Sequence, residues 1–289
     1  MRKLLLQLDT SPHASVFDRI VAFDGGADEV MSYAGVTEQT VRELVHGAIF
    51  TRGPKDLRHT AIFIGGTDMP AGERLLAAVQ KAFFGPMRVS VMLDANGSNT
   101  TAVAAVAKLA RRAGSLTGCR VVITGGTGPV GVRAAGLMAK AGADVTLTSR
   151  STAKSGVVEA VRSRFGGAVR LVPMTDESHA AAVLESADLL LNAGPAGVQL
   201  VPRSAWMGRP RLQAIADVNA VPPAGVEGID VRDDGADRDG VAAFGALAIG
   251  GLKMKIHKAC IAQLFERNDL VLDAEAIADI ARELAAAQV

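Results

Sequence analysis

Residues 120–131 read Arg-Val-Val-Ile-Thr-Gly-Gly-Thr-Gly-Pro-Val-Gly. The β-branched run Val121 to Thr124 leads into Gly126-x-Gly128-x-x-Gly131, and an alanine-rich segment with helical composition follows to Ala141. A strand, a glycine turn and a helix in this order are typical of a dinucleotide-binding unit. The alternative is a glycine-rich strand–helix turn that binds no ligand.

Each glycine of this turn has a predicted role. Gly126 is expected to make the tight turn, Gly128 to let the backbone approach a pyrophosphate, and Gly131 to let the helix pack against the strand. The N-terminus of the helix offers free N–H groups and a partial positive charge to the phosphates. We therefore expect the cofactor to contact Gly126, Thr127, Gly128, Pro129, Val130 and Gly131.

The end of the next predicted strand, Asp144–Thr148, indicates which dinucleotide binds. A site that prefers NAD usually has an acid about twenty residues past the glycines, where it accepts a hydrogen bond from the ribose 2′-hydroxyl. Here Ser149, Arg150 and Lys154 occupy this region. A guanidinium can hold a 2′-phosphate through two charge-assisted hydrogen bonds, so we expect NADP, with weaker binding of NAD. The alternative is a solvated, basic start to the next helix.

The whole chain limits the classes of protein to consider. It has 289 residues, of which 49% are hydrophobic, enough for two domains, and no apolar run approaches the ~18 residues that span a bilayer. The net charge of +1 gives no electrostatic reason to expect nucleic acid or an anionic membrane as a partner. The two cysteines, Cys119 and Cys260, lack metal-type spacing. We therefore expect a reduced, cytoplasmic protein without a metal site.

Alternation of strands and helices predicts an α/β fold with two α/β domains, the second a Rossmann-type parallel sheet that binds a dinucleotide. Residues 1–113 form the expected first domain, residues 114–267 the second, and the C-terminal helix within 268–289 rejoins the first. The Gly114–Gly118 segment is the expected hinge. In the first domain we expect strands at 3–8, 60–64 and 89–93, and helices at 15–22, 37–46 with Thr37 as its cap, 71–83 and 100–113. In the second we expect a helix at 157–164 and further strands at 169–172, 189–191 and 214–218.

Two loops follow the last two of these strands, Asn192–Gly197 and Asp217–Pro223. Ligands of parallel sheets bind beyond the carboxyl ends of the strands. We therefore expect the two loops to frame the nicotinamide end of the cofactor through Ala193, Gly194 and Asn219, although loops rich in Gly, Pro and Asn can also be simple turns.

A further candidate site lies after the glycine pair Gly250-Gly251, which we expect to break the chain before a helix. Lys253 and His257 are four residues apart and would share one face of that helix, next to an apolar stripe. A solvated helix edge is the common alternative for such a pair.

Several segments in the same order as in a known family make this chain resemble the bacterial NAD(P)-dependent methylenetetrahydromethanopterin dehydrogenases, some of which also use methylenetetrahydrofolate. The likeness covers nearly the full length. It is carried by Ser15–Asp18, Asp24–Asp28, Asp94–Thr101, Gly126–Gly131, Asn219–Gly225 and Gly245–Cys260. The resemblance implies an N-terminal domain and a Rossmann domain that flank a pterin-binding cleft, and a homotrimer in which a neighbouring subunit helps to close that cleft.

The resemblance also implies roles for single residues. Phe17, Thr101, Lys253 and His257 would form the catalytic, pterin-binding side, and the glycine loop and Arg150 would hold NADP. In the NADP-specific branch a lysine often follows the arginine directly, whereas Ser151 stands here. The implied reaction is oxidation of a methylene pterin to the methenyl form by direct hydride transfer, in one-carbon metabolism that oxidises or assimilates formaldehyde.

This chemistry agrees with the residues themselves. Hydride loss from a carbon between two nitrogens leaves an amidinium-like cation and releases no proton, so no general base is required. The motifs contain no Ser-His-Asp arrangement, paired carboxylates or metal cluster. A protonated Lys253 close to the forming cation would raise the barrier, so we expect it to face a pterin carbonyl.

Three alternatives remain. Another two-domain NADP-dependent dehydrogenase, such as a shikimate-type enzyme, would need a catalytic Lys/Asp pair in the first half of the chain, where Lys55 and Asp56 are merely adjacent. A bifunctional dehydrogenase–cyclohydrolase would need a proton-transfer residue for hydrolysis, and none is clearly placed. The third alternative is a non-catalytic protein that senses NADP.

Overall fold

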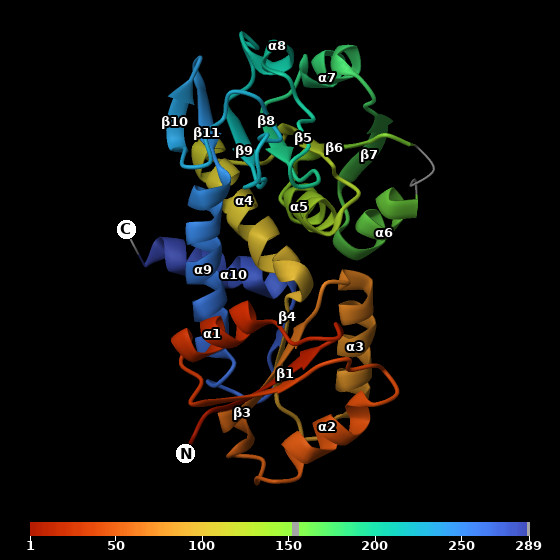
Figure 1. Cartoon of the computed structure of the whole chain (residues 1–289), viewed down its shortest axis with the longest axis vertical. Helices are drawn as coiled ribbons and strands as arrows, with labels where there is room; N and C mark the ends of the chain where they lie inside the picture. The colour runs from red at the N-terminus through yellow and green to blue at the C-terminus, as the bar shows by residue number, and fades with distance from the viewer. Residues whose placement is uncertain (152–155, 288–289) are drawn as a thin grey trace. The chain divides into compact units, whose positions relative to one another are not determined.

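The computed structural model describes residues 1–151 and 156–287 and divides the chain into two compact units. Unit 1 comprises Met1–Thr100 and Met254–Val289, and unit 2 comprises Thr101–Lys253. The chain passes from one unit to the other inside two helices, α4 (Ser98–Ala113) and α9 (Ala246–Gln263). The boundaries were expected at Gly114–Gly118 and at residue 267. The structure instead places them between Thr100 and Thr101 in α4 and between Lys253 and Met254 in α9, both labelled in Figure 1.

Unit 1 is built on a five-stranded parallel sheet in the order β12-β4-β3-β1-β2. The strands are β12 (Val271–Leu272), β4 (Ser90–Leu93), β3 (Thr60–Gly65), β1 (Leu4–Asp9) and β2 (Glu29–Tyr33). The two edge strands β2 and β12 were not predicted from the sequence. β12 has only two residues, and in β2 only Val30 is buried, so neither has the run of apolar residues that indicates a central strand.

The helices of unit 1 are α1 (Val16–Asp24), α2 (Val41–Ile49), α3 (Met69–Ala82) and α10 (Ala274–Ala286), with 3₁₀ turns η1 (Leu57–His59) and η2 (Ala95–Gly97). The expected start of α2 at Thr37 was wrong. The backbone N–H of Thr37 donates to Thr40 Oγ1 at 3.1 Å, so residues 37–40 form a turn and the helix begins after Thr40.

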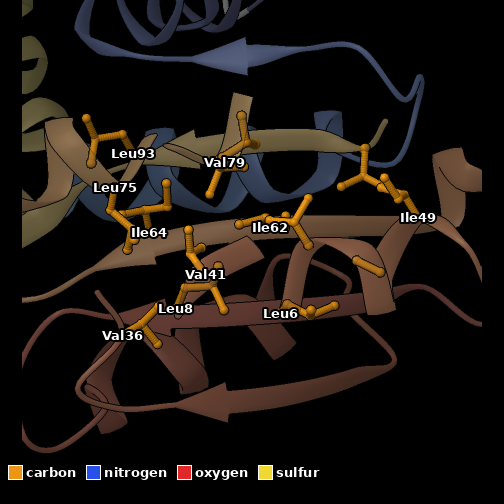
Figure 2. Packing of buried hydrophobic residues seen from close by; sticks show 14 of the residues in the cluster. Leu6, Leu8, Val36, Val41, Ile49, Ile62, Ile64, Leu75, Val79 and Leu93 are labelled. Atoms are coloured by element: carbon orange, nitrogen blue, oxygen red, sulfur yellow. The ribbon is translucent and has the colours of Figure 1, made fainter. Parts of the chain in front are cut away.

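One face of this sheet is covered by α2 and α3 (Figure 2). Leu6, Leu8, Ile62, Ile64 and Leu93 of the strands pack against Val41, Val45 and Ile49 of α2 and Leu75 and Val79 of α3. The opposite face carries Phe63, whose ring stacks on His257 of α9. Burial on both faces explains why these strands are almost continuously apolar.

Unit 2 contains a seven-stranded sheet in the order β10-β11-β9-β8-β5-β6-β7. The strands are β5 (Arg120–Thr124), β6 (Asp144–Ser149), β7 (Ala168–Pro173), β8 (Leu189–Asn192), β9 (Ala214–Asp217), β10 (Asp234–Arg238) and β11 (Val241–Phe244). All neighbouring pairs are parallel except β10 and β11, an unpredicted antiparallel hairpin at the edge. The α/β class with a Rossmann-type second sheet is thereby confirmed.

Helices cover both faces of this sheet. Helices α5 (Pro129–Lys140) and α6 (Gly156–Phe165) lie side by side on one face (Figure 1). Helices α7 (Glu177–Leu184) and α8 (Arg203–Trp206) pack over Val122, Leu190 and Ile215 on the other. The chain order reverses between β5 and β8. From β5 the sheet continues on one side with β6 and β7, and on the other side with β8 and β9. In open parallel sheets this reversal opens the crevice where ligands bind.

Helix α9 does not break at Gly250-Gly251 as expected. Neither glycine has a positive φ, and the helix is continuous from Ala246 to Gln263. A glycine inside a helix costs only about 1 kcal/mol relative to alanine, which packing on either side can offset. No helix in residues 1–151 and 156–287 is long and apolar enough to span a bilayer.

Candidate functional site

The glycine turn of unit 2 has a left-handed residue at its start. Gly125 adopts φ +62°, and a Cβ there would lie 2.4 Å from the Cα of Gly194. Gly126, which was expected to make the tight turn, has no positive φ; a Cβ on it would lie 2.7 Å from Leu147 Cδ2. The turn conformation therefore belongs to Gly125, and Gly126 is required because β6 packs closely against it.

The other two glycines are arranged as the motif requires. A Cβ on Gly131 would lie 2.7 Å from the Cα of Gly126, so α5 packs directly on the turn. A Cβ on Gly128 would meet nothing closer than the carbonyl oxygen of Gly125 at 3.4 Å, so space remains on its open side. Pro129 follows as the first residue of α5, whose first-turn N–H groups have no partner within the helix. This arrangement fits a pyrophosphate.

The end of β6 is followed by a basic side chain and not by an acidic one. Ser149 is half-buried as the last residue of β6, and Arg150 is exposed directly after it. The expected third residue, Lys154, lies outside the described residues. The basic side chain here, together with the glycine turn, provides donors suited to a dinucleotide that carries a 2′-phosphate.

The loops after β8 and β9 are joined by buried side chains. Asn192 Nδ2 donates to Asp217 Oδ1 at 2.7 Å, and Thr124 Oγ1 donates to Asn192 Oδ1 at 2.8 Å. Asn219 Oδ1 accepts from the backbone N–H groups of Gly197 at 3.2 Å and of Val221 at 3.0 Å. The predicted residues Ala193, Gly194 and Asn219 thus lie in loops held together by this network.

Thr124, Asn192 and Asp217 were not singled out from the sequence, although each is the last residue of its strand. A polar residue at the end of a buried apolar strand, just before a loop rich in glycine or proline, was the available signal.

In unit 1 the predicted His257 is fully buried. Its ring stacks on Phe63 with the ring centroids 5.4 Å apart, and its Nδ1 lies 3.9 Å from Asp94 Oδ2. The side chain exposes no surface, whereas the resemblance implies that it lines the pterin site. Lys253, one helical turn earlier on α9, is half-buried.

Asp94 organises the carboxyl end of β4. Its Oδ1 accepts from the backbone N–H groups of Asn99 at 2.9 Å and Thr100 at 3.0 Å, and its Oδ2 accepts from Thr100 Oγ1 at 2.5 Å. These bonds satisfy N–H groups of the first turn of α4, where a carboxylate is also favoured by the helix dipole.

Burial, together with the nearby Asp94 carboxylate, raises the pKa of the Cys260 thiol, which is one turn after His257. Cys260 is therefore a protonated packing residue rather than a nucleophile.

The remaining predicted residues occupy defined positions. Phe17 lies in the first turn of α1 with half of its side chain exposed, and Ser15 Oγ caps that helix by accepting from the N–H of Asp18. Thr101 is the first residue of unit 2 and Lys253 is its last, so both lie where the chain changes unit.

Lys55 and Asp56 do not form the catalytic Lys/Asp pair that a shikimate-type enzyme would need. Lys55 and Asp56 are exposed in the turn before η1, which precedes the amino end of β3. Ligands of parallel sheets bind at the opposite, carboxyl edge. Within the described parts of the chain, no three His, Cys, Asp or Glu side chains gather as a metal-binding group.

Similarity to known proteins extends over almost the whole chain. The family model for the N-terminal part of methylene-tetrahydromethanopterin dehydrogenase matches residues 16–96. The chain is 48% identical to "Bifunctional protein MdtA" of Methylorubrum extorquens, over 98% of this chain and 99% of that protein. It is 35% identical to the NAD(P)-dependent methylenetetrahydromethanopterin dehydrogenase of the same organism, again over 98% and 99% of the two chains.

Solved structures share the fold at much lower identity. Shikimate 5-dehydrogenase from Listeria monocytogenes matches with a TM-score of 0.56 and 13% identity, covering 98% of this chain and 96% of that one. Ornithine carbamoyltransferase from Pyrococcus furiosus matches with a TM-score of 0.54 and 13% identity, covering 90% and 84%. These two proteins catalyse different reactions, so the likeness concerns the fold alone. Because it is 48% and 35% identical to these two relatives over 98% of its length, this chain belongs to the methylenetetrahydromethanopterin dehydrogenase family.

Proposed function

We propose that this protein is an NADP-dependent dehydrogenase that oxidises methylenetetrahydromethanopterin to the methenyl form in one-carbon metabolism, with methylenetetrahydrofolate as a second candidate substrate. The observation that carries the proposal is the 35% identity, over 98% of the chain, to a relative named for this activity. The glycine turn with its open side at Gly128 and the exposed Arg150 support the cofactor part.

The proposed reaction needs alignment more than acid–base chemistry. The methylene carbon lies between two nitrogens, which stabilise the cation left by hydride loss, and no proton leaves. NADP, when bound, supplies the hydride acceptor. The protein's contribution is to hold both molecules so that the donor carbon meets the nicotinamide, and to exclude water from the reacting atoms.

Residues of unit 2 hold the cofactor in this proposal. The pyrophosphate binds at Gly126–Gly131 and the N-terminus of α5, and Arg150 binds the 2′-phosphate, with Ser149 beside it. Lys154 remains a predicted further contact. Ala193, Gly194 and Asn219 frame the nicotinamide end.

Phe17, Thr101 and Lys253 contact the pterin in this proposal, and the buried His257 supports the residues beside them. The half-exposed ring of Phe17 contacts the pterin ring, and the ammonium of Lys253 donates to a pterin carbonyl rather than facing the forming cation. His257, which exposes no surface, supports Asp94 and the first turn of α4, the helix that contains Thr101.

Assembly into a homotrimer belongs to the same proposal. Helix α1 carries the exposed apolar side chains Val16, Phe17, Ile20 and Phe23, and positions 16, 20 and 23 fall on one helix face. An apolar stripe of this kind suits contact with another subunit. Light scattering of the purified protein measures the mass; a monomer that is fully active at the assay concentration would contradict the trimer. Cytoplasmic location remains the expectation from cysteine usage.

The activity itself is tested with the purified chain. Incubation with NADP and methylenetetrahydromethanopterin is expected to produce NADPH and the methenyl pterin in equal amounts, followed by absorbance. NADP binding without turnover of either pterin would favour the sensor alternative. Loss of the methenyl product by hydrolysis, faster than its spontaneous rate, would add a cyclohydrolase activity.

Two glycine substitutions separate cofactor contact from folding. In Gly128→Ala the added methyl group has room in the protein but occupies the approach of the pyrophosphate, so we expect an unchanged unfolding midpoint and at least a tenfold weaker NADP affinity, about 1.4 kcal/mol. In Gly131→Ala the methyl group meets the backbone of Gly126, so we expect lower stability as well. Urea unfolding and NADP titration measure both; normal NADP affinity in Gly128→Ala would remove the glycine turn from the site.

The role of Arg150 is tested by Arg150→Ala. Loss of a charge-assisted contact to the 2′-phosphate is expected to weaken NADP binding by at least ~1.5 kcal/mol, and NAD, which lacks this phosphate, should bind almost as before. Arg232→Ala, which removes another exposed arginine of unit 2, is the control. Equal losses for the two cofactors would show that Arg150 does not recognise the 2′-phosphate.

Helix α9 is tested by Lys253→Met, His257→Gln and His257→Ala. We expect Lys253→Met to lower turnover by on the order of a hundredfold with nearly normal NADP affinity, since misplacement of a substrate by about 1 Å costs that much. Lys255→Met, an exposed neighbour on the same helix, should keep normal turnover. His257→Ala should lower both stability and turnover, because it empties a buried position beside Asp94, and His257→Gln should be milder. Steady-state rates measure turnover, and thermal unfolding measures stability. Near-normal turnover in Lys253→Met would show that Lys253 is a solvated residue at the helix edge with no role in the reaction.

A further inference from the structure

A chain of buried hydrogen bonds runs across the carboxyl ends of three neighbouring strands in unit 2. Thr124, Asn192 and Asp217 are the last residues of β5, β8 and β9, and the sheet register pairs Thr124 with Asn192 and Asn192 with Asp217. Thr124 Oγ1 donates to Asn192 Oδ1 at 2.8 Å, and Asn192 Nδ2 donates to Asp217 Oδ1 at 2.7 Å. All three side chains are at most 2% exposed.

The first of these bonds has a special place in the sheet. It joins β5 to β8, the two strands between which the chain order reverses. The crevice that receives a dinucleotide opens at this reversal. Thr124 also directly precedes the glycine turn, while Asn192 directly precedes the loop with Ala193 and Gly194. The hydrogen bond therefore joins the two segments on either side of the crevice.

Asp217 extends the chain into the second loop. Its Oδ1 also accepts from the N–H of Asn219 at 3.0 Å, and its Oδ2 accepts from the N–H of Val226 at 2.9 Å. Since an ionised carboxylate only accepts, the amide group of Asn192 must face it with its NH₂, which fixes the orientation of that amide. Asn219 then holds the loop after β8 through the N–H of Gly197.

Backbone hydrogen bonds also hold these loops, among them those from the N–H of Ala193 to the carbonyl oxygen of Thr124 at 2.9 Å and from the N–H of Val218 to that of Asn192 at 3.1 Å, but the glycines of the loops add no side-chain packing. Where they touch, glycines leave room for the backbone: a Cβ on Gly125 would lie 2.4 Å from the Cα of Gly194, and a Cβ on Gly225 would lie 1.8 Å from Asn192 Nδ2. A glycine contributes no side chain to pack and lets its backbone take many conformations. The polar chain supplies the constraint that the missing side chains cannot.

We propose that Thr124, Asn192 and Asp217 are positioning residues that fix the loops at the nicotinamide end of the cofactor, and so set the rate of hydride transfer without binding the cofactor themselves. The inference rests on the proposed NADP-dependent dehydrogenation. Buried, fully hydrogen-bonded groups make a rigid support, because breaking one bond leaves its partner unsatisfied.

Such a role affects rate more than affinity. The pyrophosphate binds in our proposal at the glycine turn, which is also held by the close packing of α5 and β6, and the 2′-phosphate binds at Arg150. These two groups supply most of the polar contacts of the cofactor. Loosening the nicotinamide end misplaces the reacting carbon, and about 1 Å of misplacement costs on the order of a hundredfold in rate.

The test compares Thr124→Val, which keeps the shape of the side chain and removes its hydroxyl, with Thr124→Ser, which retains the hydroxyl. Thr146→Val is the matched control, because it makes the same exchange at a buried position inside β6. NADP titration gives affinity, thermal unfolding gives stability, and single turnover with saturating methylenetetrahydromethanopterin gives the rate. Substrate deuterated at the methylene carbon identifies the hydride step by its isotope effect.

We expect Thr124→Val to slow the isotope-sensitive step at least tenfold, with NADP affinity within about twofold of wild type, and Thr124→Ser to recover most of the rate. Asn192→Asp, which places a carboxylate oxygen against Asp217, should slow it further if it folds. A normal rate in Thr124→Val, an equal loss in Thr146→Val, or an equal loss of affinity and rate overturns the proposal. A wild-type protein that turns over neither pterin would instead contradict the proposed function.

Discussion

The close approach of backbone to backbone around the glycine turn is the constraint on which the cofactor-binding unit depends. Helix α5 reaches the turn only because Gly131 has no Cβ to meet Gly126, and the turn reaches the loop after β8 only because Gly125 has no Cβ to meet the backbone of Gly194. These contacts bring the N-terminus of α5 and the carboxyl ends of β5 and β8 together. A phosphate and a nicotinamide can then be held by a single rigid sheet edge.

Glycines contribute no side chains that would fix the positions of the turn and the loops. Buried polar residues at the ends of the strands provide part of this support. Each of Thr124, Asn192 and Asp217 ends a strand and directly follows buried apolar residues of that strand. Replacing them by apolar residues would suit the core but would remove the side-chain hydrogen bonds that join the ends of the three strands and reach into the loop after β9. Unit 1 uses the same solution at the end of β4, where Asp94 holds the first turn of α4.

Family membership and fold give different kinds of information about this protein. Shikimate 5-dehydrogenase and ornithine carbamoyltransferase have comparable TM-scores against this chain, 0.56 and 0.54, although only one of them is a dehydrogenase. The fold thus supplies a sheet edge where ligands bind, and the side chains at that edge determine the reaction. For this chain we propose that those side chains include Arg150 and Lys253.

The amino-acid sequence by itself determined the alternation of strands and helices, the glycine turn and the absence of an acid after β6, because these depend on local residue order and periodicity. It also carried the family resemblance through ordered motifs. Only the tertiary structure decided that Gly125 makes the left-handed turn, that α9 continues through Gly250-Gly251, and that His257 is buried against Phe63 and Asp94 while Lys253 is not. It alone brought Thr124, Asn192 and Asp217 together. These features depend on contacts between residues far apart in the chain, which spacing along the sequence does not encode.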